Sequence, residues 1–342
     1  MLTRPLRGRR APLAAAALIS LAGCAGCGEV HARTAPGPQR NVVLALAGQP
    51  SALYAPLYEA QANGDFALGA LSVTVTNPPA GETPLQALAA GHASFAIASE
   101  PELLAARAGG AQLVAIASLT QGPLESIISL GGSRITSPTQ LAGATVASSG
   151  TPLADAELTS VLRAAGVAPS RVHTITVTGS LNAALLSHAA TATLGGFLDY
   201  DAVSLALARQ HPNVISLSGA GVPSFSDLVI VVRVSEAHYD GALLRAFLQS
   251  LMRGEIATLD DPQAVVKLLV RRNPRLSRSF ESAALAAGAP LASPRSQNEP
   301  FGYQNPAAWQ TFGNWMDAHG LLSHATNGAL AITDEFLPGQ GE

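Results

Sequence analysis

Two short segments of the sequence carry side chains suited to binding a small molecule. In the first, "GGFLDYDA", the aromatic residues Phe197 and Tyr200 lie beside two carboxylates, Asp199 and Asp201. Aromatic rings can stack on a flat heterocycle while a carboxylate accepts hydrogen bonds from an amino group in the plane of the ring. The structural alternative is that Asp199 caps a helix beginning near Asp201 and that Phe197 belongs to the core.

The second segment, "SSGTPL", follows a predicted strand and begins a predicted helix. Helix N-termini favour anions, so the backbone amides of Gly150 and Thr151 would suit a sulfonate, carboxylate or phosphate group. The hydroxyls of Ser148 and Ser149 would add hydrogen bonds to the same group. The alternative is an ordinary capped helix start with Pro152 in its first turn.

These segments must be positioned by the elements around them. From Asn41 the chain alternates short apolar runs with amphipathic stretches, which predicts strands joined by crossover helices. Predicted helices end at Gly64 and Gly91, because glycine adopts the left-handed conformation that caps a helix. The predicted strands are "NVVLALA", "LSVTVT", "FAIAS", "LVAIASL", "SIISL", "ATVASSG", "VHTITVTG", "ATATLGGF", "NVISLSG" and "DLVIVVR".

From Ser235 to His319 nearly every stretch is helical, and these helices should return to cover the first lobe, whose parallel sheet needs helices on both faces. The chain would cross between two α/β lobes near residues 126–130 and again near 227–233. Two crossings make a hinge, and ligands of such sheets bind beyond the carboxyl ends of the strands. The predicted lobes are residues 41–127 with 228–338, and residues 128–227.

The start of the chain is typical of an exported protein. Cationic residues precede an apolar run that ends at Gly23 and is shorter than the roughly 20 residues needed to span a bilayer. With Cys24, it resembles the lipobox of bacterial lipoproteins, in which the cysteine is lipidated and anchors the chain at the outer face of the cytoplasmic membrane. Residues 1–23 would be the signal peptide and 24–40 a flexible tether. The alternative is an ordinary signal peptide with a chance cysteine and a periplasmic protein.

Composition excludes several functional classes. The formal net charge is −3 and no basic patch indicates nucleic acid binding. No histidine pair has the HxxxH spacing of a metal site, and Cys24 and Cys27 cannot cross-link a distant core. After Arg40 no run predicts a membrane span. We expect a monomer without a cofactor or a metal.

Seven blocks in order closely resemble the NMT1/THI5-like group of solute-binding proteins. The resemblance runs from about Val42 to Pro338 and implies a periplasmic-binding-protein fold of type II. It also implies a receptor that delivers a small solute to an ABC permease and its ATPase. The blocks are "LYAPLYEAQANGDF", "SFAIASEPELLAARAGG", "LVAIASLTQGPLESIISL", "ITSPTQLAGATVASSGTPL", "GGFLDYDAV", "GVPSFSDLVIVV" and "TDEFLP".

The group includes binders of thiamine-precursor pyrimidines, so the resemblance implies an aminopyrimidine as ligand. "GGFLDYDA" follows the family's Gly-Gly-Tyr-Trp-Asn-Tyr-Glu pattern and keeps aromatic residues at Phe197 and Tyr200. Leu198 replaces the tryptophan, Asp199 the asparagine and Asp201 the glutamate. These replacements leave the exact heterocycle open.

Further candidate contacts lie at other strand ends. The loop after the first strand carries an aromatic residue and asparagines in the family's pyrimidine binders, and Ser99 stands where an aromatic residue is common. Glu100 has the alternative role of complementing a helix dipole, and Gln121 that of closing a turn. These candidates are Gln49, Ser51, Tyr54, Ser99, Glu100 and Gln121.

Two alternative functions follow from the same resemblance. One is an anion receptor for alkanesulfonates, taurine or nitrate, with the anion at the "SSGTPL" segment. The other is an enzyme, because eukaryotic relatives make the pyrimidine from a lysine-held pyridoxal phosphate and a histidine. The only lysine, Lys267, lies in a late amphipathic helix instead of at a strand end, and the cysteine-rich motif of those relatives is absent. We therefore expect no enzymatic activity.

Overall fold

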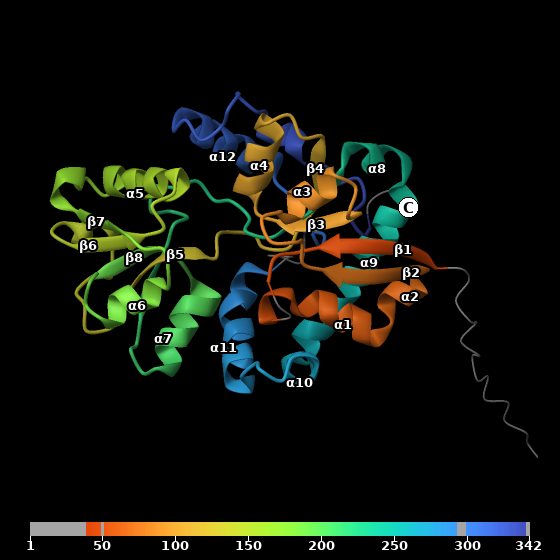
Figure 1. Cartoon of the computed structure of the whole chain (residues 1–342), viewed down its shortest axis with the longest axis horizontal. Coiled ribbons are helices and arrows are strands. Elements are labelled where there is room, and N and C mark those ends of the chain that lie inside the picture. The colour runs from red at the N-terminus through yellow and green to blue at the C-terminus, as the bar shows by residue number, and fades with distance from the viewer. Residues whose placement is uncertain (1–38, 49–50, 293–298, 340–342) are drawn as a thin grey trace, which may run out of the picture. The chain divides into compact units, whose positions relative to one another are not determined.

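The computed structural model describes residues 39–48, 51–292 and 299–339, which form two α/β lobes, each built on a five-stranded mixed sheet (Figure 1). The first sheet has the order β2-β1-β3-β10-β4. Strand β1 pairs in parallel with β2 and β3, whereas β10 is antiparallel to β3 and β4. Its strands are β1 (Arg40–Ala45), β2 (Leu71–Thr76), β3 (Phe95–Ala98), β4 (Leu113–Ser118) and β10 (Val229–Arg233).

The second sheet has the order β7-β6-β8-β5-β9. Strand β6 pairs in parallel with β7 and β8, whereas β5 is antiparallel to β8 and β9. Each sheet therefore contains one strand that enters it from the other lobe and runs against its neighbours. The strands are β5 (Glu125–Ser129), β6 (Thr145–Ser148), β7 (His173–Thr176), β8 (Ala192–Phe197) and β9 (Asn213–Ser216).

All ten strands fall on the apolar runs that the sequence predicts, but two expectations were wrong. The sheets are mixed, not parallel, because β10 and β5 return from the other lobe. The crossings lie at residues 119–124 and 217–228, just before the strands in which we expected them. Strands β5 and β10 lie inside one sheet each, with most of their side chains buried, so neither can serve as the connection.

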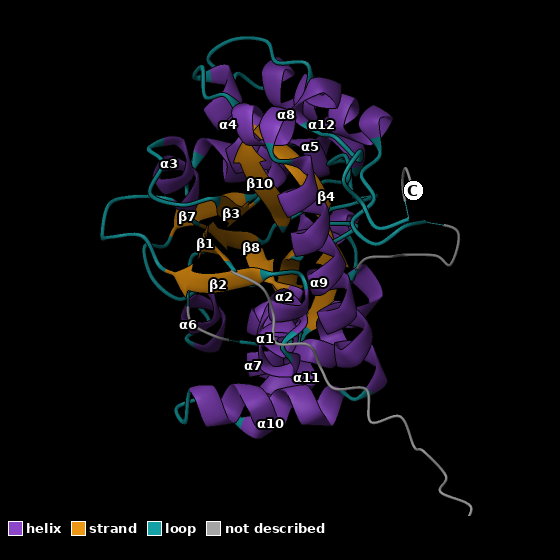
Figure 2. Cartoon of the chain, turned by 90° about the vertical axis from the view of Figure 1, so that its right-hand side faces the viewer, coloured by secondary structure: helices purple, strands orange, loops and turns teal. Residues whose placement is uncertain are grey.

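Helices lie above and below the layer of strands (Figure 2). The α-helices are α1 (Ala55–Asn63), α2 (Asp65–Leu68), α3 (Pro84–Ala89), α4 (Glu100–Ala108), α5 (Pro152–Ala164), α6 (Leu181–Leu186), α7 (Val203–Leu207), α8 (Val234–Tyr239), α9 (Gly241–Asp260), α10 (Pro262–Arg272), α11 (Arg278–Gly288) and α12 (Pro306–Ala318). Short 3-10 turns are η1 (Ala52–Tyr54), η2 (Pro138–Leu141), η3 (Pro169–Arg171), η5 (Ala289–Leu291) and η6 (Gly328–Ala331), and η4 (Leu198–Ala202) is a π-helical turn.

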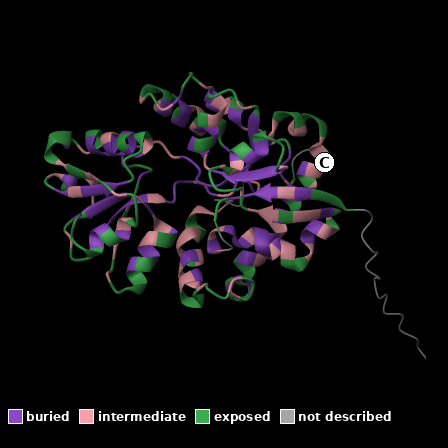
Figure 3. Cartoon of the chain, viewed as in Figure 1, coloured by how far each residue is buried: buried purple, intermediate pink, exposed green. Residues whose placement is uncertain are grey.

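One core of the first lobe lies between the sheet and α9, and the opposite face of the sheet packs against α4 and α12. The ring of Phe247 on α9 stacks on that of Phe95 in β3 with their centroids 4.0 Å apart, and Phe66 packs on the same ring. Burial is concentrated on β3, β4 and β10 of the first sheet and on β5, β6 and β8 of the second, whereas β7 and β9 at the edges of the second sheet have no buried residue (Figure 3). No helix within the described ranges has the length and hydropathy of a membrane-spanning segment.

Two late helices contact both lobes instead of covering only the first. On α12, the indole nitrogen of Trp315 donates a hydrogen bond of 3.0 Å to Ser160 of α5. On α11, the ring of Phe280 packs edge-on against Tyr200 of η4, while Glu281 accepts a hydrogen bond of 2.7 Å from the backbone nitrogen of Ala52. These contacts hold the lobes beside each other at two places outside the hinge.

The two crossing segments are hydrogen-bonded to each other. One carboxylate oxygen of Asp227 accepts from the backbone nitrogens of Leu124 at 2.5 Å and Glu125 at 3.2 Å. In return, the hydroxyl of Thr120 accepts from the backbone nitrogens of Asp227 and Leu228. Because these side chains pair with the backbone of the opposite segment, the two crossings form one connected hinge.

Helix α9 approaches α1 so closely that only glycine fits at the contact. A Cβ atom at Gly254 would overlap the carbonyl oxygen of Pro56 and lie 2.8 Å from the Cβ atom of Ala60. We expect Gly254→Ala to lower the free energy of unfolding by about 1–3 kcal/mol, measured by urea denaturation. In the control Gly313→Ala on α12, the new atom would lie 3.6 Å from its nearest neighbours, so stability should stay the same or rise. Equal effects of the two substitutions would contradict this packing.

Candidate functional site

A cavity of about 340 Å³ lies between the lobes, beyond the carboxyl ends of β1, β3 and β8. The first lobe contributes residues after β1 and at the start of α4, and the second contributes the start of α5 and the end of β8. The hinge segments close the back of the cavity. We call this space the interlobe cavity, and its lining includes Ala47, Leu53, Tyr54, Ser99, Glu102, Leu124, Glu125, Leu153, Phe197, Asp227 and Leu228.

The polar lining of the interlobe cavity is acidic. Three carboxylates, Glu102, Glu125 and Asp227, face it, and none of the described residues that line it is a lysine, arginine or histidine. Burial raises the pKa of Glu125 well above its usual value, and the nearby carboxylate of Glu157 adds to this effect. Burial likewise raises the pKa of Asp227 to about 7, although its hydrogen bonds to the hinge backbone oppose the shift. The cavity is therefore built to favour ligands that donate hydrogen bonds or carry positive charge.

A further buried acid lies behind this lining. One oxygen of Glu100 accepts a hydrogen bond of 3.0 Å from the backbone nitrogen of Ser226, and the other has no partner in the described part of the chain. Burial raises the pKa of Glu100 to about 8 against the opposing effect of this hydrogen bond, with a smaller contribution from Asp227. Glu100 thus connects the start of α4 with the second crossing.

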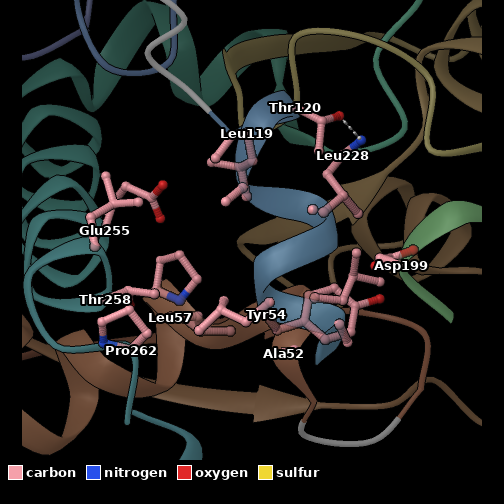
Figure 4. Close-up of a pocket in the computed structure, with 18 of the residues that line it drawn as sticks. Ala52, Tyr54, Leu57, Leu119, Thr120, Asp199, Leu228, Glu255, Thr258 and Pro262 are labelled. Carbon is pink, nitrogen blue, oxygen red and sulfur yellow. Dashed lines mark hydrogen bonds between the residues drawn. The ribbon is translucent and has the colours of Figure 1, made fainter. Parts of the chain in front are cut away.

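A second cavity, of about 250 Å³, lies between η1, α1, α9 and α11 (Figure 4). Most of its lining is apolar, including Leu57, Leu119, Leu251 and Leu285. Glu255 and Asp199 bring carboxylates to it, and burial raises the pKa of Asp199 to about 6. The two cavities share part of a wall, which is formed by Leu53, Tyr54, Ile97, Leu124 and Leu228.

The candidates after β1 are only partly described. Gln49 lies outside the described residues, as does Cys24. Tyr54 is buried between the two cavities and its hydroxyl donates a hydrogen bond of 2.7 Å to the carbonyl oxygen of Ala47. Burial raises the pKa of this hydroxyl to about 12. Ser51 precedes η1, half-buried, without a side-chain capping bond, and does not line either cavity.

The candidates at the starts of α4 and α5 mainly cap those helices. Ser99 lines the interlobe cavity but also forms a capping box with Glu102. The hydroxyl of Thr151 accepts from the backbone nitrogen of Ala154, and Ser149 is exposed beside it. Ser149, Gly150 and Thr151 do not line the interlobe cavity. From the start of α5, Leu153 lines it instead.

The four candidate residues of the segment "GGFLDYDA" do not form one site, because their side chains have different surroundings. Phe197 lines the interlobe cavity, whereas Asp199 lines the second cavity. Tyr200 is 62% exposed and packs on Phe280 of α11. Asp201 accepts a hydrogen bond of 2.9 Å from the backbone nitrogen of Phe197, which is a structural role at the end of β8. Phe197 is the last residue of β8, whereas Asp199, Tyr200 and Asp201 follow one another in the π-helical turn η4, where their side chains have different surroundings.

The last candidate, Gln121, lies in the first crossing. Its side-chain nitrogen donates to the carbonyl oxygen of Tyr303 at 2.9 Å, and its backbone nitrogen donates to that of Leu291 at 2.7 Å. It does not line either cavity. The described residues contain no group of three His, Cys, Asp or Glu side chains that could hold a metal ion.

Glu125, Asp227 and Glu255 were not among the site residues predicted from the sequence. Glu125 and Asp227 flank β5 and β10, where an acid looks like an ordinary strand boundary. The sequence could have revealed both, because an acid lies at or beside each predicted crossing and hinge segments close the back of the cleft. Glu255 was detectable as a carboxylate on the apolar face of α9, four residues after Leu251.

Comparison with known proteins places the chain in a family. The model of the "NMT1/THI5 like" family matches residues 52–265. The chain belongs to this family. A curated relative from Halalkalibacterium halodurans, named formylaminopyrimidine-binding protein, is 27% identical over 86% of this chain and 91% of its own length.

Solved structures of similar fold include both a binding protein and an enzyme. The periplasmic aliphatic sulphonate binding protein SsuA from Escherichia coli is 17% identical, with a TM-score of 0.69 over 88% of this chain and 94% of its own. The desulfurization enzyme DSZB is 14% identical, with a TM-score of 0.61 over 86% of this chain and 97% of its own. This likeness confirms the type II periplasmic-binding-protein fold.

The buried acids predict that stability falls as pH rises. The pKa of Glu100 is about 8 in the folded protein and lower in the unfolded chain. Between about pH 4.5 and pH 8 the folded protein therefore keeps a proton on Glu100 that the unfolded chain loses. The free energy of unfolding should decrease through this window, and scanning calorimetry should give a Tm several degrees higher at pH 5 than at pH 8. Glu100→Gln should flatten the decrease, whereas Asp155→Asn on the exposed face of α5 should leave it unchanged. The same slope in Glu100→Gln and the unchanged protein would contradict the assignment.

Proposed function

We propose that this protein is the solute-binding component of an ABC importer and that it binds a small amine-bearing heterocycle, such as a thiamine-precursor aminopyrimidine. The observation that carries the proposal is the interlobe cavity, in which three carboxylates face apolar walls without a cationic side chain. The name of the curated relative, formylaminopyrimidine-binding protein, supports the same class of ligand.

The lining can satisfy each part of such a ligand. An aminopyrimidine has apolar faces and carries its amino donors in the ring plane, so it needs apolar contacts above and below and acceptors at its edge. Phe197 and Leu53 supply apolar surface from opposite lobes. Glu125 supplies an acceptor from the hinge, and its raised pKa would fall when a donor or cation replaces lost water.

The same lining disfavours an alkanesulfonate or another anion. An anion in a cavity of this size needs cationic or backbone donors, because desolvating its charge costs several kcal/mol. In the described part of the chain no cationic residue lines the cavity, and the amides near Gly150 and Thr151 lie outside its lining. Bringing an anion beside Glu102, Glu125 and Asp227 would add repulsion.

A binding role also agrees better with the position of Lys267 than an enzymatic role does. Schiff-base chemistry needs a lysine nitrogen in the cleft. Lys267 is exposed on α10 and lines neither cavity. We therefore propose that closure of the lobes on a solute, read by a permease, is the activity of this chain, since ligand shifts such an equilibrium through contacts made only in the closed form.

Glu125→Gln is the sharpest test of the ligand class. Unlike Asp227, Glu125 does not hold the hinge with its side chain, so its substitution should spare the fold. We expect formylaminopyrimidine to raise the Tm of the unchanged protein and bind to it in calorimetry, whereas taurine and ethanesulfonate should do neither. Glu125→Gln should weaken the pyrimidine at least about tenfold, the loss of one charge-assisted hydrogen bond.

The matched control is Asp155→Asn, which removes the same charge from the exposed face of α5. It should leave pyrimidine affinity within about twofold, because exposed charges are screened by salt. Sulfonate binding without pyrimidine binding would refute the proposed ligand class. A response to neither ligand class would refute the transport role.

We further propose that Cys24 is lipidated and that the anchored protein lies at the outer face of the cytoplasmic membrane, with residues 24–40 as a tether. The support is the apolar run that ends beside the cysteine, together with the cationic residues before it. Expressed with its leader, the protein should partition with membranes and its mass should include acyl chains on Cys24. Cys24→Ser should move it to the aqueous fraction. An unmodified Cys24 in the exported protein would contradict the proposal.

A further inference from the structure

The second cavity has properties of a binding site that the transport role does not require. Most of its walls come from the first lobe, with Leu57 on α1, Leu251 on α9 and Leu285 on α11 facing the space, and Asp199 is its contribution from the second lobe. An engineered protein cavity of about 150 Å³ holds benzene, so 250 Å³ has room for one aromatic ring and a short chain. The size therefore indicates a small, mostly apolar ligand.

Glu255 is the unusual member of this lining. It is only 6% exposed, it has no hydrogen bond or ion pair with any described residue, and its carboxylate points into the cavity (Figure 4). It lies one turn after Leu251 on the apolar face of α9, where an apolar side chain would pack at no electrostatic cost. Burying a carboxylate without a partner is costly, and burial alone raises its pKa to about 7. An occupant that paired with the carboxylate would remove this cost.

Other polar groups at the cavity already have partners. The hydroxyl of Thr258 donates to the carbonyl oxygen of Gly254 at 2.7 Å, and that of Thr120 accepts from the hinge backbone. The second carboxylate, Asp199, lies across the cavity from Glu255 in Figure 4. Among the described residues that line the space, none is a lysine, arginine or histidine. With this described lining, an occupant that supplies hydrogen-bond donors or positive charge is favoured over an anion.

The cavity reaches the surface on the side of α9 and α10. Leu259 is 52% exposed although it lines the cavity, and the lining residues Pro262 and Gln263 are exposed as well. Gln263 donates a hydrogen bond of 3.1 Å to Ser282, which ties α10 to α11 at this rim. A ligand can thus enter at the corner of these helices without passing through the interlobe cavity.

We propose that this cavity is a second ligand site, which binds a small apolar amine with its ammonium group beside Glu255 and its hydrocarbon part against Leu57, Leu251 and Leu285. The site is separate from the interlobe cavity and does not depend on the function proposed for that cavity. Leu53, Tyr54 and Leu228 form the wall between the two.

The test compares three compounds of one shape by calorimetry at pH 8. We expect 2-phenylethylamine to bind and its neutral analogue 2-phenylethanol to bind at least about tenfold more weakly. Phenylacetate should not bind. Glu255→Gln keeps the shape of the side chain, and it should weaken the amine about 30-fold while leaving 2-phenylethanol unchanged. Asp260→Asn removes a charge from the exposed end of the same helix and should leave amine affinity within about twofold.

Competition decides whether the sites are separate. Saturating formylaminopyrimidine should leave the affinity for 2-phenylethylamine unchanged, and so should Glu125→Gln. Absence of amine binding, equal binding of the amine and the alcohol, or an unchanged affinity in Glu255→Gln would each overturn the proposal. Displacement of the amine by the pyrimidine would overturn it too. Failure of pyrimidine binding alone would refute only the proposed transport ligand.

Discussion

The carboxylate of Asp227 joins the two places at which the chain passes between the lobes. It accepts hydrogen bonds from the backbone of the first crossing while it belongs to the second, and Thr120 returns two bonds to the backbone beside Asp227. This exchange fixes the position of Glu125, which begins β5 and faces the interlobe cavity. The geometry of the cavity therefore depends on a hinge that is held by a buried acid, whose pKa is raised by that burial.

The buried acids in and around the interlobe cavity lower the stability of the folded protein. Glu100, Glu125, Glu157 and Asp227 all have raised pKa values, chiefly because burial disfavours their charged forms. No described ion pair neutralises any of them. Of these acids, Glu125 and Asp227 line the interlobe cavity, so a ligand with amino donors would lower their pKa values and recover part of the cost of burying them, whereas an anion would add repulsion. Helices α11 and α12 contact the second lobe, so any movement of the lobes relative to each other would change the packing of these two helices.

Much of the fold could be predicted from the sequence, because its strands are short apolar runs and its helices end at glycines such as Gly64 and Gly91, both of which have positive φ. The direction of β5 and β10 could not, since pairing depends on contacts far apart in the chain. The candidate site was predicted less well. Spacing placed Phe197, Asp199 and Tyr200 in one site, but the strand β8 ends at Phe197 and the π-helical turn that follows gives Asp199 and Tyr200 other surroundings. Glu125 and Asp227 became visible only when the crossings were located.

The most direct test of the central claim is a crystal structure of the protein grown with saturating formylaminopyrimidine. We expect the ring in the interlobe cavity, in contact with Phe197, with an amino nitrogen within hydrogen-bond distance of the carboxylate of Glu125 or Asp227. A pyrimidine bound elsewhere, or a ring in the cavity whose amino groups avoid both carboxylates, would contradict the account.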